Sequence, residues 1–503
     1  MRTEFFQLEI LSPVYIGTGE EIDPMAYLMR QDENQILCHV LDTRTWAAEY
    51  PDPDELSATF SGTNIPAMRS YLANHIDPAL YGLRAVMVSE EKIFHEYQAK
   101  LADQHSSHQL LISPHLSCRE QVPVLPGSSI KGALRTAVID WLDREKHLNL
   151  KAARAEDRNG RAYIRRLESV LGPITDNAFK QLKIGDVMGY QDSTLLVEPR
   201  ELRRKAGKEA TPKTKCEVLP SRLLGDRRQA LMHTRIALGS PHKKDDQRFT
   251  LPNGQSWEWN ELATLANAFY RERYLEEKNK FYNLPHFAPA RLHLAEIETV
   301  LLNPAPGQMV LRVGHYSQVE FVTVHNNQPF TRKGQQGTPL PSGTTRTLAN
   351  GLYPFGWICL TPCTEEAYLK GLYLCESANL IALRRKESGR AEVLRERARH
   401  QEQIVFREAA LRAQQAAEQR RQEELAAIPE EERNIVLLER GELNEQQIFD
   451  LFASLDSLES NLQQRAAKAL KALWITEKRW SKKECSKKQL EKVKKIKSIL
   501  GEP

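Results

Sequence analysis

Apolar and polar residues alternate near the start of the chain. Phe6, Leu8 and Ile10 are apolar, whereas Gln7 and Glu9 between them are polar. A period of two is typical of a half-buried β-strand, so a strand is expected over Phe5–Ile10. The segment Ile16–Gly19 then breaks the pattern with two glycines, which indicates a tight turn.

A second pattern runs from Val122 to Val138. Val122–Leu125 is strand-like, and after Pro126 and Gly127 the apolar residues recur at helical spacing. Ser128 and Ser129 can cap the start of that helix. Its apolar face comprises Ile130, Leu134, Ala137 and Val138. The sequence therefore predicts a strand, a turn and a helix in succession.

Further elements follow from the same periodicities. The range 57–108 is mostly helical in pattern and is interpreted as an α-helical insertion, and a second amphipathic helix is expected over Trp257–Leu275. Strands are expected at the following β-branched and apolar runs: Glu217–Pro220, Thr234–Leu238, His293–Leu302, Met309–Val313 and Val319–Val324.

The end of the chain changes character. Gly389–Ala427 is rich in Ala, Glu, Gln and Arg, with too few apolar residues for a core, which indicates a long solvated helix ended by Pro429. Helical periodicity returns in Glu442–Leu500. We therefore predict an α+β fold of two α+β units with a helical insertion, followed by an all-α domain. The expected domain ranges are 1–185, 186–375, 376–430 and 431–503.

Charge is nearly balanced over the chain but unevenly distributed. The 503 residues include 70 Lys or Arg and 66 Asp or Glu. Arg200–Arg248 holds fourteen basic residues against six acidic ones, and Glu477–Leu500 holds ten against three. The first stretch suggests basic loops around a hairpin. The second is either a solvated helix face or a surface with affinity for RNA or a partner.

Cysteine usage and apolar runs exclude several classes of protein. The seven cysteines are scattered and the first residues are polar, which favours a reducing, cytoplasmic setting. No run reaches the length of about 20 apolar residues that spans a bilayer. Cys359, Cys363 and Cys375 lack a CxxC pair or matching histidines, so buried thiols are expected in place of a metal site.

The strongest local signal for chemistry lies between Gly127 and Arg135. A glycine and two serines at a helix start leave backbone N–H groups that can bind phosphate, and the helix dipole favours negative charge there. Lys131 and Arg135 are four residues apart and share one helical face, while Gly132 leaves room for close approach. The alternative is a capped amphipathic helix with two solvated cations. The Walker pattern is not met, which disfavours nucleotide hydrolysis.

These residues also carry a resemblance. The segment Leu125–Arg135 resembles the signature of the RAMP superfamily of CRISPR proteins, whose members have ferredoxin-like, RRM-type folds. The order of motifs is most similar to the type III-A subunit at the 3′ end of the guide RNA, over about Met1–Leu374, although Thr344 stands where that family often has a basic residue. Three more segments agree in order: Leu11–Gly19, Leu311–His315 and Thr344–Leu348, the last leading to Pro354–Trp357.

The resemblance implies two ferredoxin-like units and a function without catalysis. The protein would bind the backbone of the guide RNA (crRNA), end the filament of neighbouring RAMP backbone subunits of a Csm complex, and define the guide's 3′ boundary, with trimming done by host exonucleases. No cofactor or metal is implied. The residues implied to line the RNA groove are Gly17, Gly19, Gly127, Ser128, Ser129, Lys131, Gly132, Arg135, Gly314, His315 and Arg346.

A competing hypothesis is a RAMP-type endoribonuclease that processes crRNA. His105, His108 and His115 lie close together in sequence, Asp23 follows the first glycine turn, and Lys333–Gly337 is a weak glycine-rich loop. Cleavage of RNA needs a base and an acid on opposite sides of one phosphate, and no such pairing is evident. A third hypothesis, a host-type RNA-binding protein with a coiled arm, leaves the ordered motifs unexplained. The sequence therefore favours a protein that is not an enzyme.

Overall fold

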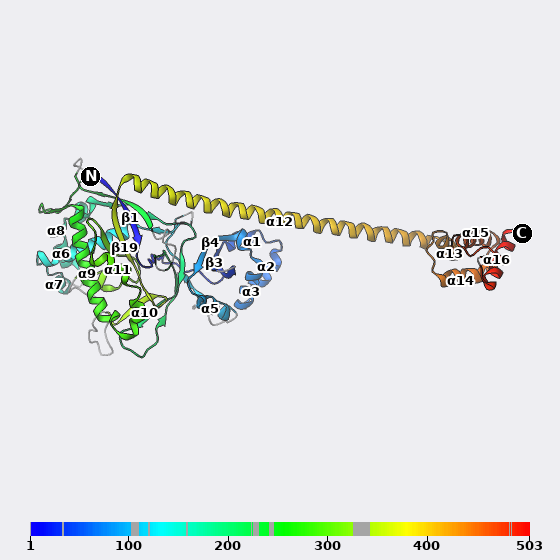
Figure 1. Cartoon of the computed structure of the whole chain (residues 1–503), viewed down its shortest axis with the longest axis horizontal. Helices are drawn as coiled ribbons and strands as arrows, with labels where there is room; N and C mark the ends of the chain where they lie inside the picture. Colours follow the sequence, from blue (N-terminus) through cyan, green and yellow to red (C-terminus); the bar gives the residue numbers. More distant parts are fainter. Residues whose placement is uncertain are drawn as a thin grey trace. The chain divides into compact units, whose positions relative to one another are not determined.

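The structure is a computed structural model of the whole chain, and it divides into two compact units, Met1–Leu394 and Arg395–Pro503 (Figure 1). It describes all residues except 1, 33–34, 102–109, 119–120, 157–158, 223, 225–230, 241–245, 325–342, 482 and 484, and the side chains of residues 2, 154 and 155.

The first unit is built around a five-stranded antiparallel sheet with the strand order β16-β19-β1-β13-β7. Along β1, the side chains of Phe6, Leu8 and Ile10 are fully buried, which confirms the predicted strand. The strands are β1 Arg2–Ile10, β7 Leu182–Ile184, β13 Leu231–Leu238, β16 Met309–Arg312 and β19 Trp357–Cys363.

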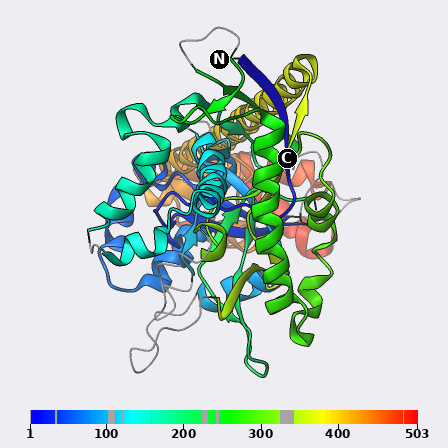
Figure 2. The ribbon, with the colours of Figure 1, turned by 90° about the vertical axis from the view of Figure 1, so that its left-hand side faces the viewer.

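Two long helices, α6 (Gly127–Glu145) and α9 (Trp259–Glu277), pack against this sheet and against each other (Figure 2). Both helices were predicted from their apolar periodicity. Ile130 and Leu134 of α6 and Ala266 and Tyr270 of α9 join Leu8 of the sheet in one hydrophobic core. After Glu277 the helix widens into a π-helical turn, Lys278–Tyr282.

The central sheet crosses the predicted domain boundary at residue 185. Strands β1 and β7 precede this boundary, whereas β13, β16 and β19 follow it. Because β1 pairs with both β13 and β19, residues 1–185 and 186–375 do not form two independent sheets. Sequence periodicity indicates which segments are strands but not which distant strands pair.

A six-stranded mixed sheet carries the helical insertion, with the order β2-β3-β4-β9-β12-β5. Over residues 57–101, the part of the predicted insertion that the structure describes, the regular elements are helices except for β4, which joins the sheet. The strands are β2 Tyr27–Asp32, β3 Gln35–Leu41, β4 Gly82–Val88, β5 Ile112–Ser113, β9 Leu195–Val197 and β12 Lys215–Val218. The helices are α1 Thr43–Ala48, α2 Pro53–Phe60, α3 Ile65–His75, α4 Pro78–Tyr81 and α5 Glu91–Leu101.

Smaller elements complete the first unit. A four-stranded sheet has the order β11-β10-β17-β18, and two further pairs are β6 with β8 and β14 with β15. These strands are β6 Val124–Leu125, β8 Val187–Met188, β10 Pro199–Arg203, β11 Thr211–Pro212, β14 Phe249–Thr250, β15 Ser256–Trp257, β17 Thr345–Ala349 and β18 Tyr353–Pro354. The remaining helices are α7 Leu150–Glu156, α8 Arg161–Leu171, α10 Ala288–Arg291 and α11 Ala295–Leu302.

Two strand predictions are wrong. His293–Leu302 contains the helix α11, and Val319–Phe321 is a 3₁₀ turn. Both segments are short and mix apolar with charged residues, and over so few positions a strand and a helix cannot be told apart by periodicity.

The helix α12 (Glu365–Ala427) begins in the first unit and continues in the second. Its first turns lie on the sheet face opposite α6 and α9, where Tyr368 packs against Phe5 with 4.8 Å between ring centroids. In the second unit, four helices close a separate small core. They are α13 Glu430–Glu439, α14 Glu445–Ser454, α15 Ser460–Thr476 and α16 Lys487–Leu500. The long solvated helix and the C-terminal helical region are thus observed.

Candidate nucleic-acid interface

The first turn of α6 lies directly against the end of β7. A Cβ atom on Gly127 would come within 2.2 Å of the carbonyl oxygen of Ile184, so this contact requires glycine. The N–H of Gly127 donates to Oδ1 of Asp186 at 2.8 Å. A carboxylate therefore already caps one of the N–H groups that the sequence suggested for phosphate binding.

The two cations of the predicted site have different surroundings. The ammonium of Lys131 is half-buried and donates to the carbonyl of Leu182 at 2.7 Å. Burial, and then the nearby charge of Lys183, lower the pKa of Lys131. The guanidinium of Arg135 is exposed and lies 5.8 Å from the centre of the Phe179 ring. Arg135 is thus more accessible to a ligand than Lys131.

Two further exposed cations, on β7 and β13, lie beside the start of α6 but on the opposite face of the sheet, and sequence reasoning missed them. Lys183 of β7 and Arg235 of β13 are exposed diagonal neighbours on one face of the sheet, since Gly185 N–H donates to the Arg235 carbonyl at 3.0 Å. No acidic side chain of the described residues pairs with Arg135, Lys183 or Arg235. We refer to Lys131, Arg135, Lys183 and Arg235 as the α6 cationic cluster. The alternation expected for a strand over Thr234–Leu238 could have predicted that Arg235 points away from the core.

Ser128, Gly132 and Arg135 form an exposed stripe along α6, at spacings of four and three residues. Ser129 beside them is half-buried. A Cβ atom on Gly132 would meet no other atom within 4 Å. The fold therefore has no packing reason for a glycine that costs about 1 kcal/mol relative to alanine within a helix. Because Gly132 has no side chain, the helix surface is flat here and a ligand can approach the backbone closely.

Gly17 and Gly19 lie in the segment that follows β1. Gly17 forms an isolated bridge with His115, and a Cβ atom on it would fall 2.6 Å from the Tyr15 hydroxyl. Gly19 has a left-handed backbone with φ of 84°, and a Cβ atom there would meet nothing within 4 Å. Both glycines are exposed.

Gly314 and His315 adjoin the same segment from the other half of the chain. Gly314 has φ of 81°, and a Cβ atom on it would lie 2.5 Å from the carbonyl oxygen of Tyr15. The N–H of His315 donates to that same oxygen at 2.8 Å. The imidazole is exposed, and partial burial followed by the charge of Lys213 lowers its pKa.

Backbone hydrogen bonds join these motifs into one strip. From Tyr15, the strip continues through Leu116 N–H, which donates to the Ile16 carbonyl at 2.8 Å. Val124 N–H then donates to the Leu116 carbonyl at 2.9 Å, and Val124 lies three residues before Gly127. The structure thus brings Gly17, Gly127 and His315, which are far apart in sequence, onto connected backbone.

Arg346 does not belong to this surface, which corrects the expectation from the sequence. Its side chain is only 1% exposed. It forms ion pairs with Glu277 at 2.5 Å and with Glu320 at 3.0 Å. A buried guanidinium with two carboxylate partners stabilises the junction of α9 and β17 and is not available to a phosphate.

His115 and Asp23 are the candidate catalytic residues that the structure describes, and each has a structural partner of its own. His115 is 2% exposed, and burial lowers its pKa to about 4. Its Nδ1 accepts from the N–H of Ile16 at 3.2 Å, so the neutral ring donates from Nε2 to the Val124 carbonyl at 3.1 Å. Asp23 is exposed and accepts from Met25 N–H. His105, His108 and 333–337 lie outside the described residues.

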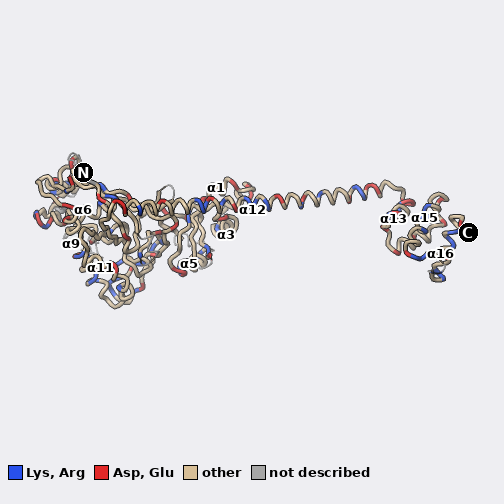
Figure 3. The backbone as a smooth tube through the Cα atoms, turned by 45° about the horizontal axis from the view of Figure 1, so that its top comes forward, with Lys and Arg blue, Asp and Glu red and all other residues tan. Residues whose placement is uncertain are grey.

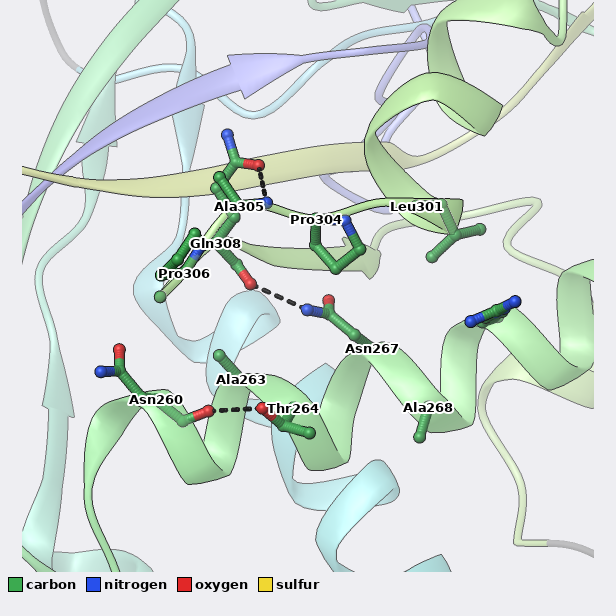
Figure 4. A pocket seen from close by; sticks show the side chains of 12 residues that line it. Asn260, Ala263, Thr264, Asn267, Ala268, Leu301, Pro304, Ala305, Pro306 and Gln308 are labelled. Carbon is green, nitrogen blue, oxygen red and sulfur yellow. Dashed lines mark hydrogen bonds between the residues drawn. The ribbon is translucent and has the colours of Figure 1, made fainter.

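A separate hollow of about 460 Å³ lies between α9 and the loop 304–308 (Figure 4). Asn267 of α9 accepts from Val310 N–H and donates to the Gln308 carbonyl, both at 2.8 Å. Its amide therefore imitates a neighbouring strand along the edge of β16 and protects that edge from pairing with another chain. The contacts of Asn267 beside this hollow thus have a structural role, which is to cover the edge of β16.

The described residues contain neither a metal-binding cluster nor a membrane-spanning helix. No group of three or more His, Cys, Asp or Glu side chains is placed to hold a metal ion there. None of the helices in that part of the chain combines the length and apolarity needed to cross a membrane. Cys359 and Cys375 are buried, and Cys363 is half-buried.

Comparisons with known proteins agree with these motifs. Residues 7–245, just under half of the chain, match the family model described as the RAMP superfamily, and we refer to these matched residues as the RAMP region. The chain is similar to the CRISPR system protein Csm5 of Methanocaldococcus jannaschii, with 24% identity over 191 residues. That match covers 36% of this chain and 42% of the archaeal protein, so it spans less than half of the relative's length.

Two solved structures are also similar. A chain of the cryo-EM structure of a Csm-crRNA-target RNA ternary complex in a type III-A CRISPR-Cas system aligns with a TM-score of 0.49 and 20% identity, covering 72% of this chain and 100% of that one. The crystal structure of T. onnurineus Csm5 aligns with a TM-score of 0.43 and 17% identity, covering 70% and 99%.

Proposed function

We propose that this chain binds crRNA and caps its 3′ end in a type III-A CRISPR effector complex, without cleaving RNA. The α6 cationic cluster is the observation that carries the proposal. Lys131 and Arg135 lie on the signature helix of the RAMP region, and the other two members adjoin its start from β7 and β13. No acidic side chain among the described residues pairs with any of the four. Cations that meet phosphates hold RNA of any sequence, as a protein that binds variable guides must.

We also propose that the central sheet is ferredoxin-like. Along the chain, β1, α6, β7, β13, α9 and β19 follow the order strand, helix, strand, strand, helix, strand. Their order in the sheet is β19-β1-β13-β7, with β16 added at the edge. The start of α12 packs on Phe5 in the middle of the other sheet face, so we propose that RNA runs along the open edge at β7, beside α6, instead of across the sheet.

In the proposed complex, the partners are crRNA and the neighbouring RAMP backbone subunits. Binding of the last guide nucleotides would end the filament and shield those nucleotides, while host exonucleases remove RNA beyond the protected end. The similarity to Csm5 supports this assignment. Holding RNA in its ground state gives affinity without rate, so the proposed role needs no general base.

Salt-dependent RNA binding tests the proposal. We expect Arg135→Ala, Lys183→Ala and Arg235→Ala together to weaken binding of a single-stranded guide. The slope of log affinity against log salt should fall by about 2, since each phosphate contact in single strands contributes about 0.7. The control replaces Arg395, Arg399 and Arg407 of α12, which carry the same charge. An equal slope in both variants would refute the assignment of these cations to RNA.

A further inference from the structure

The second unit carries a strongly basic helix, α16, whose position is fixed by its apolar side. Val493 and Ile496 are buried in the core of this unit together with Leu470 and Trp474 of α15. At about 100° per residue, the lysines at 487, 488 and 494 point away from this buried side, together with Glu491, whereas Lys492 lies at its edge beside α14. Lys492 is half-exposed and the other three lysines are exposed. Basic positions are blue along α16 in Figure 3. We refer to these four lysines as the α16 lysine face.

The α16 lysine face has excess charge that the fold does not neutralise. Lys495 pairs with Asp456 at 2.7 Å, and Lys471 of α15 pairs with Glu502. Within the part of the chain that the structure describes, no carboxylate pairs with any of the four lysines of the face. In contrast, acidic and basic residues are interspersed along α12 (Figure 3). The unpaired lysines of α16 thus contrast with the mixed charges of α12.

An aromatic side chain borders these lysines. Phe449 of α14 is 52% exposed, and Nζ of Lys492 lies 4.8 Å from the centre of its ring. The same ammonium is 5.4 Å from the ring of Phe452. Cations beside an exposed aromatic ring form a surface on which phosphates and an unpaired base can be bound together.

We propose that the α16 lysine face and Phe449 form a second nucleic-acid site, which binds the backbone of a single strand and stacks one base. This site lies outside the RAMP region, so it does not depend on the function proposed for the α6 cationic cluster. A membrane surface is disfavoured because a helix that binds lipid needs its apolar side free, and that side of α16 is buried. An acidic protein would satisfy the lysines but would leave the exposed ring unexplained.

The test compares two full-length variants that each lose four positive charges. One carries Gln at Lys487, Lys488, Lys492 and Lys494. The control carries Gln at four exposed arginines of α12: Arg395, Arg399, Arg407 and Arg420. Binding of a short labelled single-stranded RNA is measured between about 50 and about 200 mM salt. Circular dichroism confirms that both variants retain their helices.

We expect the α16 variant to lower the salt slope by up to about 3, at about 0.7 per lost contact, while the control keeps the parent slope. Phe449→Leu should reduce quenching of a 2-aminopurine base in the RNA while leaving the slope unchanged. Equal slopes in the α16 variant and the control would overturn the proposal. The proposal would also fail if the α16 variant bound RNA normally but lost an acidic protein partner.

If the α6 cationic cluster did not bind RNA, its own variant would show no slope change, whereas the α16 comparison would still give its difference. The two proposals can therefore fail separately. Loss of slope in both sets of variants, with additive effects, would indicate two independent RNA sites on one chain.

Discussion

A Cβ atom on Gly127 would lie 2.2 Å from the carbonyl oxygen of Ile184, so α6 can begin against β7 only because residue 127 has no side chain. Gly132, one turn further along, has no such constraint. Packing inside the fold thus requires a glycine at position 127, whereas a requirement for glycine at position 132 would have to come from a ligand at the surface.

Alanine substitutions should separate these reasons. We expect Gly127→Ala to destabilise the first unit by about 1–3 kcal/mol, because the backbone of β7 must move. Gly132→Ala should instead stabilise it by up to about 1 kcal/mol, since alanine favours the helix. Urea unfolding of both variants and the parent measures the difference. Equal stability of the Gly127 variant and the parent would show that this contact is not tight.

The Gly132 variant should also bind RNA less tightly despite its greater stability. If the guide backbone approaches α6 at this stripe, the added methyl group displaces it, and we expect a loss of roughly tenfold in affinity, or about 1.4 kcal/mol. Anisotropy of a labelled guide measures this effect. Unchanged affinity would indicate that RNA does not contact α6 at Gly132.

His115 should make the stability of the first unit depend on pH. Its pKa is about 4 in the folded protein, whereas an unperturbed histidine has a pKa near 6.5. Between these values the unfolded chain binds the proton and the folded chain does not. The free energy of unfolding therefore falls as pH drops from about 6.5 to about 4, by up to about 1.4 kcal/mol per unit.

The control for this pH dependence is His115→Asn, whose amide can accept from Ile16 N–H but does not titrate. Urea unfolding at several pH values within the same window should show a smaller slope for this variant than for the parent. The same slope in both proteins would mean that other groups cause the acid sensitivity.

The buried ion pairs of Arg346 lead to a prediction about stability and not about RNA. Arg346→Ala leaves Glu277 and Glu320 without one of their cations in the interior, so we expect a loss of about 3–5 kcal/mol. Arg203→Ala, at an exposed position of β10, should change stability by less than about 0.5 kcal/mol. If Arg346→Ala kept its stability but lost RNA affinity, Arg346 would belong to the RNA site after all.

The purified chain is expected to leave RNA intact. Guide precursor and target RNA are incubated with the protein, with and without divalent metal, beside a variant carrying Ala at Asp23, His105 and His108. His115 is tested alone as His115→Asn, because its removal would disturb the buried backbone that it bonds. Cleavage by the parent that disappears in a variant would favour the endoribonuclease hypothesis.

The sequence predicted those helices and strands that have a distinctive pattern of residues within their own length. β1, α6 and α9 show a clear period over their length, whereas the long helix over Gly389–Ala427 was expected from its composition, and the structure confirms all four. The segment that became α11 was misassigned because its apolar run is short. The pairing of β1 with β13 and β19 could not be predicted, since partners more than 200 residues apart leave no periodic trace.

The sequence likewise predicted only those residues of the candidate site that belong to a local motif. Gly127, Gly132 and Arg135 follow from the motif itself. The burial of His115 and Arg346 depends on contacts with other segments, Val124 and Glu277 among them. The sequence alone therefore did not show that these two polar side chains are shielded from water. Lys183 and Arg235 joined the cluster only through the pairing of β7 with β13.

The central claim is that this chain defines the 3′ end of the guide. The most direct measurement is sequencing of guide 3′ ends from effector complexes that contain the parent chain, the Arg135, Lys183 and Arg235 triple Ala variant, or the α12 control with Arg395, Arg399 and Arg407 replaced. We predict uniform ends with the parent and the control, and heterogeneous ends with the triple variant incorporated at normal levels. Identical ends in all three complexes would contradict the proposal.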